Sequence, residues 1–301
     1  MLPYEDHFSY HASAVAFGAR FSAPPAWEAS ASVALPSMGG RATAAASHYL
    51  LDGGFVRFAS AGSEVVGDQT DAGGGRTSFR TRATTWIEGL RIGPYLEIDS
   101  LQVGLESRYL MTPHEAAHEP EFLSLDVQPR GVRVCGRDWR GQGTPELDWA
   151  NKQRTFASAR GDFLRRKALP AKTRIGLPEK RIYSAAGGGS LVSIDDAKTP
   201  EVVDRLFVFA LEPPAKLETK SLVCPRPGCA HAGAKVEGVL GGVGLTWTHP
   251  QAEAATVSFR FGEYVVTPGR RRFTAVRMWM TRSPRSEIVV AELELNGAKH
   301  P

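Results

Sequence analysis

The chain has 301 residues, enough to bury a substantial core in one large domain or two modest ones. Hydrophobic residues at 42% and charged residues at 23% are ordinary for a globular protein, which excludes disorder as the default state. The net charge of +4 is small for this length and by itself indicates neither nucleic-acid nor membrane binding.

Targeting signals give little information. No run of eighteen apolar residues occurs, which excludes a membrane-spanning helix. The first ten residues lack both the basic and the apolar part of a secretion signal. The compartment is therefore open, with the cytoplasm as the default expectation.

Short apolar runs separated by Gly and Pro predict strands through the first 110 residues. The first strand is expected over residues 10–21 and ends at Pro24–Pro25, in preference to an Ala-rich helix. Its two predicted faces are Val15, Phe17 and Phe21, and Ala12, Ala14 and Ala16. Further strands are expected near residues 31–35, 54–59 and 78–90.

The apolar pattern changes phase between residues 95 and 106. Leu96 and Ile98 share one parity, whereas Leu101 and Val103 share the other. One extra residue near Asp99–Ser100 would keep both halves of the strand facing the core, so the pattern predicts a β-bulge and a bend.

The segment His114-Glu115-Ala116-Ala117-His118 matches H-E-x-x-H, in which two histidines of one helical face bind zinc and the glutamate acts as general base. Thr112 and Pro113 suit a helix start, but Pro120 ends the helix within two turns. The segment resembles the zincin metallopeptidase signature over these five residues only, and the extended form with a third histidine is absent. A polar capped turn is the preferred interpretation, and a zinc site is the alternative.

Glu146 is the candidate third zinc ligand, in the manner of zincins that use a distant glutamate. It lies on a second predicted helix that begins at Thr144–Pro145 and carries Trp149, Phe156 and Phe163 at intervals of seven residues. An aromatic stripe with this spacing is typical of a helix that packs on a core.

Three cysteines, an odd and sparse set, favour a reducing compartment over a disulfide framework. Cys135 is expected to be a small buried hydrophobic residue. Cys224, Cys229 and His231 lie within eight residues on a turn rich in Pro and Gly, a spacing that suits a zinc ion or a small disulfide loop. Free thiols are the preferred interpretation, because no second pair of ligands completes a zinc site.

Alternating apolar residues predict an antiparallel meander at the C-terminal end. Leu206–Leu211 is a continuous apolar run that predicts a buried strand ahead of this meander. Pro268–Gly269 and Ser283–Pro284 are the expected turns between the last strands. The alternating residues are Val243, Leu245 and Trp247, then Val257, Phe259 and Phe261, then Phe273, Ala275 and Trp279, and finally Val289, Ala291, Leu293 and Leu295.

Basic and aromatic residues gather around the last hairpins of this meander. One interpretation makes them a polyanion-binding or nucleic-acid-binding surface that uses phosphate contacts and stacking. The preferred interpretation is a solvated hairpin end, where acidic residues of neighbouring strands pair with the arginines. The candidate binding residues are Arg270, Arg271, Arg272, Arg277, Trp279 and Arg282, and the candidate acidic partners are Glu263, Glu287, Glu292 and Glu294.

These patterns predict a mainly β protein, either one antiparallel β-sandwich or two packed β domains, with one or two short helices in the middle section. The expected division is a β-rich region over residues 1–110, a mixed connector over 111–170 and an antiparallel β region over 171–301. All three could also form one domain.

The sequence contains no G-x-S-x-G elbow, phosphate-binding loop or dinucleotide fingerprint. We therefore expect a non-catalytic binding or assembly protein without a cofactor, whose β framework presents loops and arginines to a protein partner, to its own copy or to a glycan. The alternatives are a zinc-dependent hydrolase and a polyanion-binding protein, and nucleic acid is not the expected partner.

Overall fold

The computed structural model describes residues 8–22, 25–111, 122–134, 136–143, 181–184, 190–193, 204–207, 209–212, 234–239, 242–247, 255–267, 270–280 and 286–299. All regular structure in these ranges is β-strand apart from the 3₁₀ turn η1 (Asp52–Gly54). None of the described segments forms a helix with the length and apolarity needed to cross a bilayer.

The strands form two antiparallel sheets, and the first of them has ten strands. The N-terminal and C-terminal strands meet in this sheet, because β1 (Phe8–Ser22) pairs with β17 (Ser286–Lys299). Strand β14 (Gly242–Trp247) pairs with β15 (Ala255–Thr267), which also pairs with β11 (Asp204–Phe207), and β13 (Ala234–Val239) pairs with β14. The order is β2 (Pro25–Ala34), β1 (Phe8–Ser22), β17 (Ser286–Lys299), β16 (Arg270–Met280), β15 (Ala255–Thr267), β11 (Asp204–Phe207), β10 (Ser190–Ser193) and β9 (Arg181–Ser184), with β14 (Gly242–Trp247) and β13 (Ala234–Val239) off this path.

The second sheet has seven strands and is mainly a meander of consecutive strands. Its order is β12 (Phe209–Glu212), β8 (Arg137–Gly143), β7 (Phe122–Val134), β6 (Leu96–Met111), β5 (Arg76–Ile92), β4 (Val56–Gly73) and β3 (Gly40–Leu51). Short connections between adjacent strands make antiparallel neighbours the natural arrangement.

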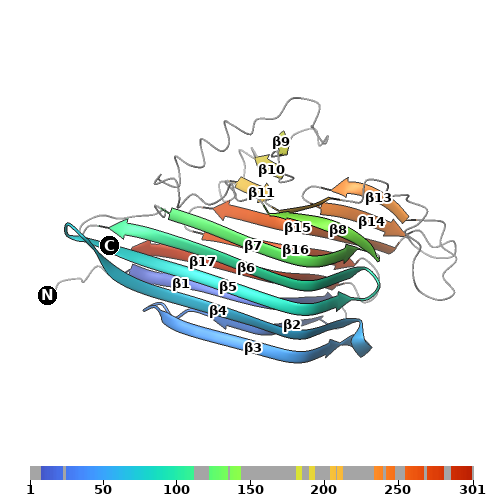
Figure 1. Ribbon diagram of the computed structural model, residues 1–301, viewed down its shortest axis with the longest axis horizontal. Helices are drawn as coiled ribbons and strands as arrows, with labels where there is room; N and C mark the ends of the chain where they lie inside the picture. Colours follow the sequence, from blue (N-terminus) through green and yellow to red (C-terminus); the bar gives the residue numbers. More distant parts are fainter. Residues whose placement is uncertain are drawn as a thin grey trace.

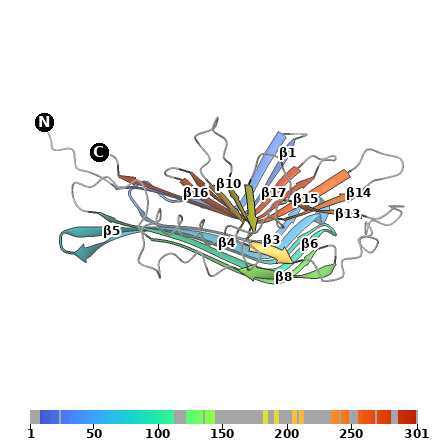
Figure 2. The same cartoon turned by 90° about the horizontal axis from the view of Figure 1, so that it is seen from above.

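The two sheets stack face to face as the layers of a sandwich (Figures 1 and 2). Phe8 of β1 stacks on Phe79 of β5 with ring centroids 4.5 Å apart, and Phe17 lies 5.9 Å from Phe58 of β4. Fully burying one such side chain stabilises the fold by about 1.5–3 kcal/mol. The predicted mainly β, antiparallel sandwich is confirmed, and the predicted domain boundaries at residues 110 and 170 stay a prediction.

Each sheet is crossed by a line of residues at which its strands change face. In the seven-stranded sheet one residue from each of five neighbouring strands lies on this kink line, and the pairing register is the same on both sides of it. Positive φ occurs on alternate strands. The members are His48 (φ 53°), Ala59, Gly89 (φ 63°), Asp99 and Gly131 (φ 58°).

The ten-stranded sheet has a matching kink line with the same alternation. Its alanines are buried, whereas every member of the first line is exposed. One line therefore faces the interior and the other faces solvent, which allows two bent sheets to stay stacked. The members are Ala31 (φ 50°), Ala16, Ala291 (φ 53°), Ala275 and Gly262 (φ 66°).

The phase change predicted near Asp99 lies on the first kink line, and Ile98 and Leu101 on either side are both buried, as expected. The predicted bulge, one extra residue in a single strand, is wrong. Gly89 and Gly131 of the neighbouring strands lie at the same level as Asp99, so the whole sheet changes face together.

The second kink line also corrects the predicted faces of the first strand. The sequence pattern put Val15 and Phe17 together, with the alanines opposite. In the structure Ala12, Ala14 and Phe17 are fully buried and Val15 is only half-buried, because β1 changes face at Ala16. A strict period of two residues fails wherever a strand crosses a kink line.

Two other strand predictions differ from the structure. Strand β3 was not predicted, because its Ala-rich sequence lacks apolar alternation. The run Leu206–Leu211 was predicted as one strand but is divided between β11 and β12, which belong to different sheets. The C-terminal meander β14–β15–β16–β17 is confirmed. The helices predicted from Thr112 and Thr144 lie outside the described residues, as does Cys135.

Candidate binding faces of the sandwich

The candidate zinc ligands cannot be placed in this fold. His114, Glu115, His118 and Glu146 lie outside the described residues, and so do Cys224, Cys229 and His231. Among the residues that are described, no group of three or more His, Cys, Asp or Glu side chains is arranged to hold a metal ion. Both zinc hypotheses stay predictions.

The arginine cluster is divided between the core and the surface. Arg271 is only 1% exposed, and its Nη1 donates a hydrogen bond to the Tyr109 hydroxyl of the facing sheet at 3.3 Å. Arg272 and Trp279 are partly exposed. This division follows from the strand itself, because neighbouring residues point to opposite faces. Arg282 and the side chain of Arg270 lie outside the described residues.

Arg277 is engaged by the adjacent strand β17. Its Nη1 lies 2.8 Å from Glu287 Oε1, and its Nη2 lies 3.1 Å from Glu292 Oε2. The cross-strand pairing expected between the arginines and these acidic residues therefore occurs at Arg277. A guanidinium held by two carboxylates offers less positive charge to a polyanion.

Trp86 stands on the outer face of the seven-stranded sheet and is 37% exposed. On β5 it lies directly between Gly62 of β4 and Gln102 of β6. A Cβ atom added at Gly62 would overlap Cζ2, Cε2 and Cη2 of the Trp86 indole. The indole thus lies on the Gly62 backbone, with one ring face against the sheet and the other toward solvent.

The two carboxylates next to Trp86 both have partners. Glu88 accepts a hydrogen bond from Ser60 Oγ at 2.8 Å. Glu64 forms an ion pair with Arg41 of β3, with Nε and Oε1 2.5 Å apart. The charge of Glu64 is therefore balanced by Arg41, whereas Glu88 keeps its negative charge.

A neutral row continues from Trp86 across the next two strands. Gln102 of β6 and Gln128 of β7 are exposed and lie opposite each other. Gln128 Nε2 donates a hydrogen bond to Asp126 Oδ2 at 2.7 Å. A Cβ at Gly104 of β6 would meet no atom within 4 Å, so space is open beside this row.

Trp27 provides a second exposed indole, on the outer face of the ten-stranded sheet. It is 49% exposed, and a Cβ at Gly18 of β1 would lie 2.8 Å from its Cη2. The Arg20 guanidinium carbon lies over the ring, 5.2 Å from the centroid, which is cation–π geometry. The outer ring face of Trp27 is therefore covered by a residue of the same sheet.

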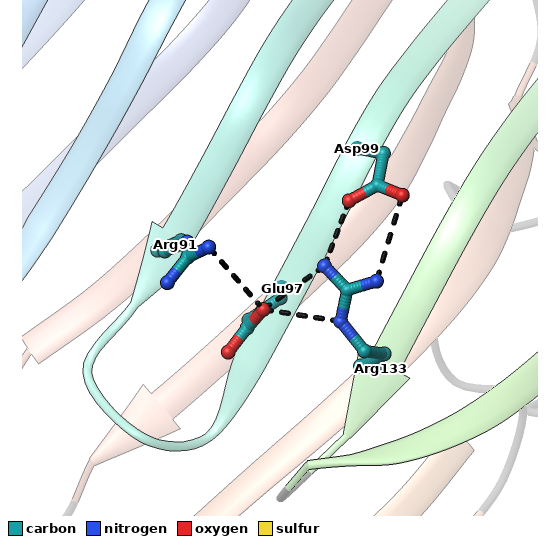
Figure 3. Close-up of polar contacts among 4 residues, drawn as sticks. All are labelled: Arg91, Glu97, Asp99 and Arg133. Carbon is teal, nitrogen blue, oxygen red and sulfur yellow. Dashed lines mark hydrogen bonds and ion pairs between the residues drawn. The ribbon is translucent and has the colours of Figure 1, made fainter.

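A charged network lies at the β5–β6 end of the outer face (Figure 3). Arg133 of β7 contacts Asp99 at 2.7 Å and Glu97 at 3.0 Å, and Arg91 lies 3.9 Å from Glu97. The hydrogen bonds that Arg133 donates to Asp99 and then to Glu97 raise the pKa of Arg133. These charges neutralise one another, and they hold the strands together where the sheet crosses its kink line.

One protein family matches part of this chain, and the description of that family states no activity. Residues 8–144 are similar to the family described as Domain of unknown function (DUF8256). The matched segment is less than half of the chain and includes Trp27, Trp86 and β1 to β8. No curated protein and no solved structure matches the chain.

Neither exposed tryptophan was predicted as a site residue, although the sequence carries a signal for Trp86. Trp86 lies within a predicted strand, at the same parity as Arg80, Arg82 and Glu88. A tryptophan among charged residues on one strand face indicates an exposed indole. Trp27 lacked such a signal, because β2 was predicted only near residues 31–35.

Proposed function

We propose that this protein is a non-catalytic assembly protein in which the sandwich pairs with a second copy of the chain through β3. The observation that supports this most directly is the free edge. Among the described strands β3 is the last of the seven-stranded sheet and hydrogen-bonds to β4 on one side only. A strand edge with free backbone donors and acceptors is a template for another strand.

The edge strand lacks the usual protection against pairing. Proteins keep edge strands apart by making them short or by adding charged residues and proline. Strand β3 has twelve residues and no proline, and its one Lys, Arg, Asp or Glu residue is Arg41, which pairs with Glu64. Small side chains fill the rest of its first half, so a second backbone can approach closely.

Two copies of β3 can pair with each other around a two-fold axis at Ala44. This register keeps the outer-face residues of both strands on one side and the inner-face residues on the other. No like charges meet, which removes the main obstacle to self-pairing. The opposed residues would be Arg41 with Ser47, Ala42 with Ala46, and Thr43 with Ala45.

The edge is also held in position before pairing. The Tyr49 hydroxyl of β3 donates a hydrogen bond to Glu28 Oε2 of β2 at 2.6 Å and so joins the edges of the two sheets. A strand that is already ordered loses less conformational entropy on association.

The test is the molar mass of the protein by light scattering over a range of concentrations. We expect a dimer for the wild type and a monomer for the double variant Thr43→Lys, Ala45→Lys, which places lysines on the exposed face of the edge. The matched control Thr70→Lys, Ala72→Lys puts the same changes on exposed positions of β4 away from β3 and should stay dimeric. A monomeric wild type, or an edge variant that remains dimeric, would rule out this assembly.

A further inference from the structure

We propose that the free indole face of Trp86 is a stacking platform for a neutral glycan. The indole lies on Gly62, which fixes the ring roughly along the sheet and leaves its outer face exposed. The face of an aromatic ring carries partial negative charge, and the C–H groups of a sugar ring carry partial positive charge. A sugar ring can therefore lie flat on Trp86.

The polar groups in line with Trp86 suit the hydroxyls of a sugar. Gln102 and Gln128 follow Trp86 in one row across β6 and β7, and each amide can both donate and accept hydrogen bonds. Adjacent strands are about 4.8 Å apart, which is close to the length of one sugar ring. The open space at Gly104 leaves the row accessible, so two or three linked sugars can follow it.

The charges around the indole favour an uncharged ligand. The positions directly and diagonally opposite Trp86 are Gly62, Gln102, Ser60, Glu64, Ser100 and Gly104, none of them basic. At these positions beside the indole an anionic polymer would meet the carboxylates of Glu64 and Glu88 and no basic side chain. Arg41 balances the charge of Glu64, and a hydrogen bond from Ser60 occupies one oxygen of Glu88, which lowers what a cationic ligand would gain here.

This site is separate from the proposed assembly edge. Trp86 lies on β5, two strands away from β3, and its outer face is perpendicular to the direction in which β3 would pair. Loss of dimer formation would therefore leave the glycan site unchanged, and loss of glycan binding would leave the dimer unchanged.

The first experiment is retention of the purified protein on insoluble cellulose, chitin and mannan, with heparin resin as the polyanionic comparison. We expect the protein to be retained on at least one neutral polysaccharide. We do not expect it to be retained on heparin alone. Calorimetric titration with the matching soluble oligosaccharide should then show that Trp86→Ala weakens binding about tenfold or more. Trp86→Tyr should keep part of the affinity, because an aromatic face remains.

The matched control is Trp27→Ala, which removes an equally large exposed indole from the opposite sheet and should bind as the wild type does. Gln102→Ala should weaken binding less than Trp86→Ala. The proposal is overturned if no neutral polysaccharide retains the protein, if only heparin does, or if Trp86→Ala binds as well as the wild type.

Discussion

Trp27 and Trp86 occupy comparable positions on the two outer faces of the sandwich, and they differ in what covers them. Each indole lies on a glycine of the neighbouring strand, Gly18 or Gly62. Arg20 then covers Trp27, whereas within the described part of the chain no ring or cation stacks on Trp86. The same packing leaves one indole in contact with a cation and the other without such a contact among the described residues.

This difference shows which features distinguish a structural tryptophan from a candidate ligand platform. Exposure alone does not, because Trp27 is more exposed than Trp86. The glycine sets the orientation of the ring, and the neighbouring cross-strand residue decides whether the outer ring face stays free. Substitution of the glycine should therefore change the free energy of unfolding more than substitution of the covering residue does.

The largest effect is expected for Gly62→Ala. The new Cβ would overlap three atoms of the Trp86 indole, so the ring must leave its position, at a cost of about 1–3 kcal/mol in the free energy of unfolding. Gly18→Ala should cost less, because its Cβ meets only the outer end of Trp27 at 2.8 Å. Denaturant unfolding of both variants measures the comparison, and equal losses would contradict it.

The stability of the contact between the edge strands β2, which carries Trp27, and β3 is expected to depend on Tyr49. Tyr49→Phe removes the hydrogen bond to Glu28 and should lower the free energy of unfolding by about 1 kcal/mol or less, because the pair is partly exposed. Unfolding of Tyr49→Phe near neutral pH measures this. No change in stability would mean that the bond does not hold the two edges together.

The same residue predicts a dependence on alkaline pH. Burial, and then the hydrogen bond and charge of Glu28, raise the pKa of Tyr49 above its ordinary value of 10.0. The folded state therefore keeps the phenol protonated to a higher pH than the unfolded state does. The stabilisation from the protonated Tyr49 phenol is complete below about pH 10 and is lost as the pH rises further. Tyr49→Phe should lose less stability than the wild type above that pH. Tyr10, whose pKa burial raises to about 12, should leave a residual dependence.

A smaller effect is expected for Arg20→Ala. Loss of the cation–π contact should cost about 0.5–1 kcal/mol and expose the outer face of Trp27. Acrylamide quenching of tryptophan fluorescence should increase in this variant. Arg82→Ala is the control, because Arg82 is exposed on the outer face that carries Trp86 and should leave quenching unchanged. Unchanged quenching in Arg20→Ala would show that Arg20 does not cover the ring.

The smallest effect is expected for Gly104→Ala, beside the neutral row of Trp86. Its Cβ would enter open space, and alanine restricts the unfolded chain more than glycine does. The free energy of unfolding should rise by about 0.5 kcal/mol. A loss of more than about 1 kcal/mol would show that the space beside the row is filled.

The fold class could be predicted from alternation, but individual faces could not. The C-terminal meander was identified because residues such as Phe273 and Leu293 repeat with a period of two residues. Strand β3 was missed because alanine, serine and threonine are found on both faces of an edge strand. The face of Val15 was assigned wrongly because a kink line requires pairing across several strands, and local sequence does not show this.

The candidate sites depended even more on long-range contacts. Arg271 stands in a run of three arginines that looks solvent-exposed, yet its hydrogen-bond partner Tyr109 is 162 residues away in sequence. Trp86 and Gly62 have no recognisable motif, since their relation arises only when β4 and β5 pair. Spacing along one segment can indicate a local motif, whereas a face shared by several strands appears only in the folded sheet.

The most direct test of the account compares both tryptophans in one titration. Indole Nε1–H resonances of ¹⁵N-tryptophan-labelled protein, assigned with Trp86→Phe and Trp27→Phe, would be followed during addition of oligosaccharides of cellulose, chitin or mannan. We predict that the Trp86 resonance shifts in a saturable manner while that of Trp27 stays in place. A resonance of Trp86 that does not move with any of these sugars, or one of Trp27 that moves in its place, would contradict the central claim.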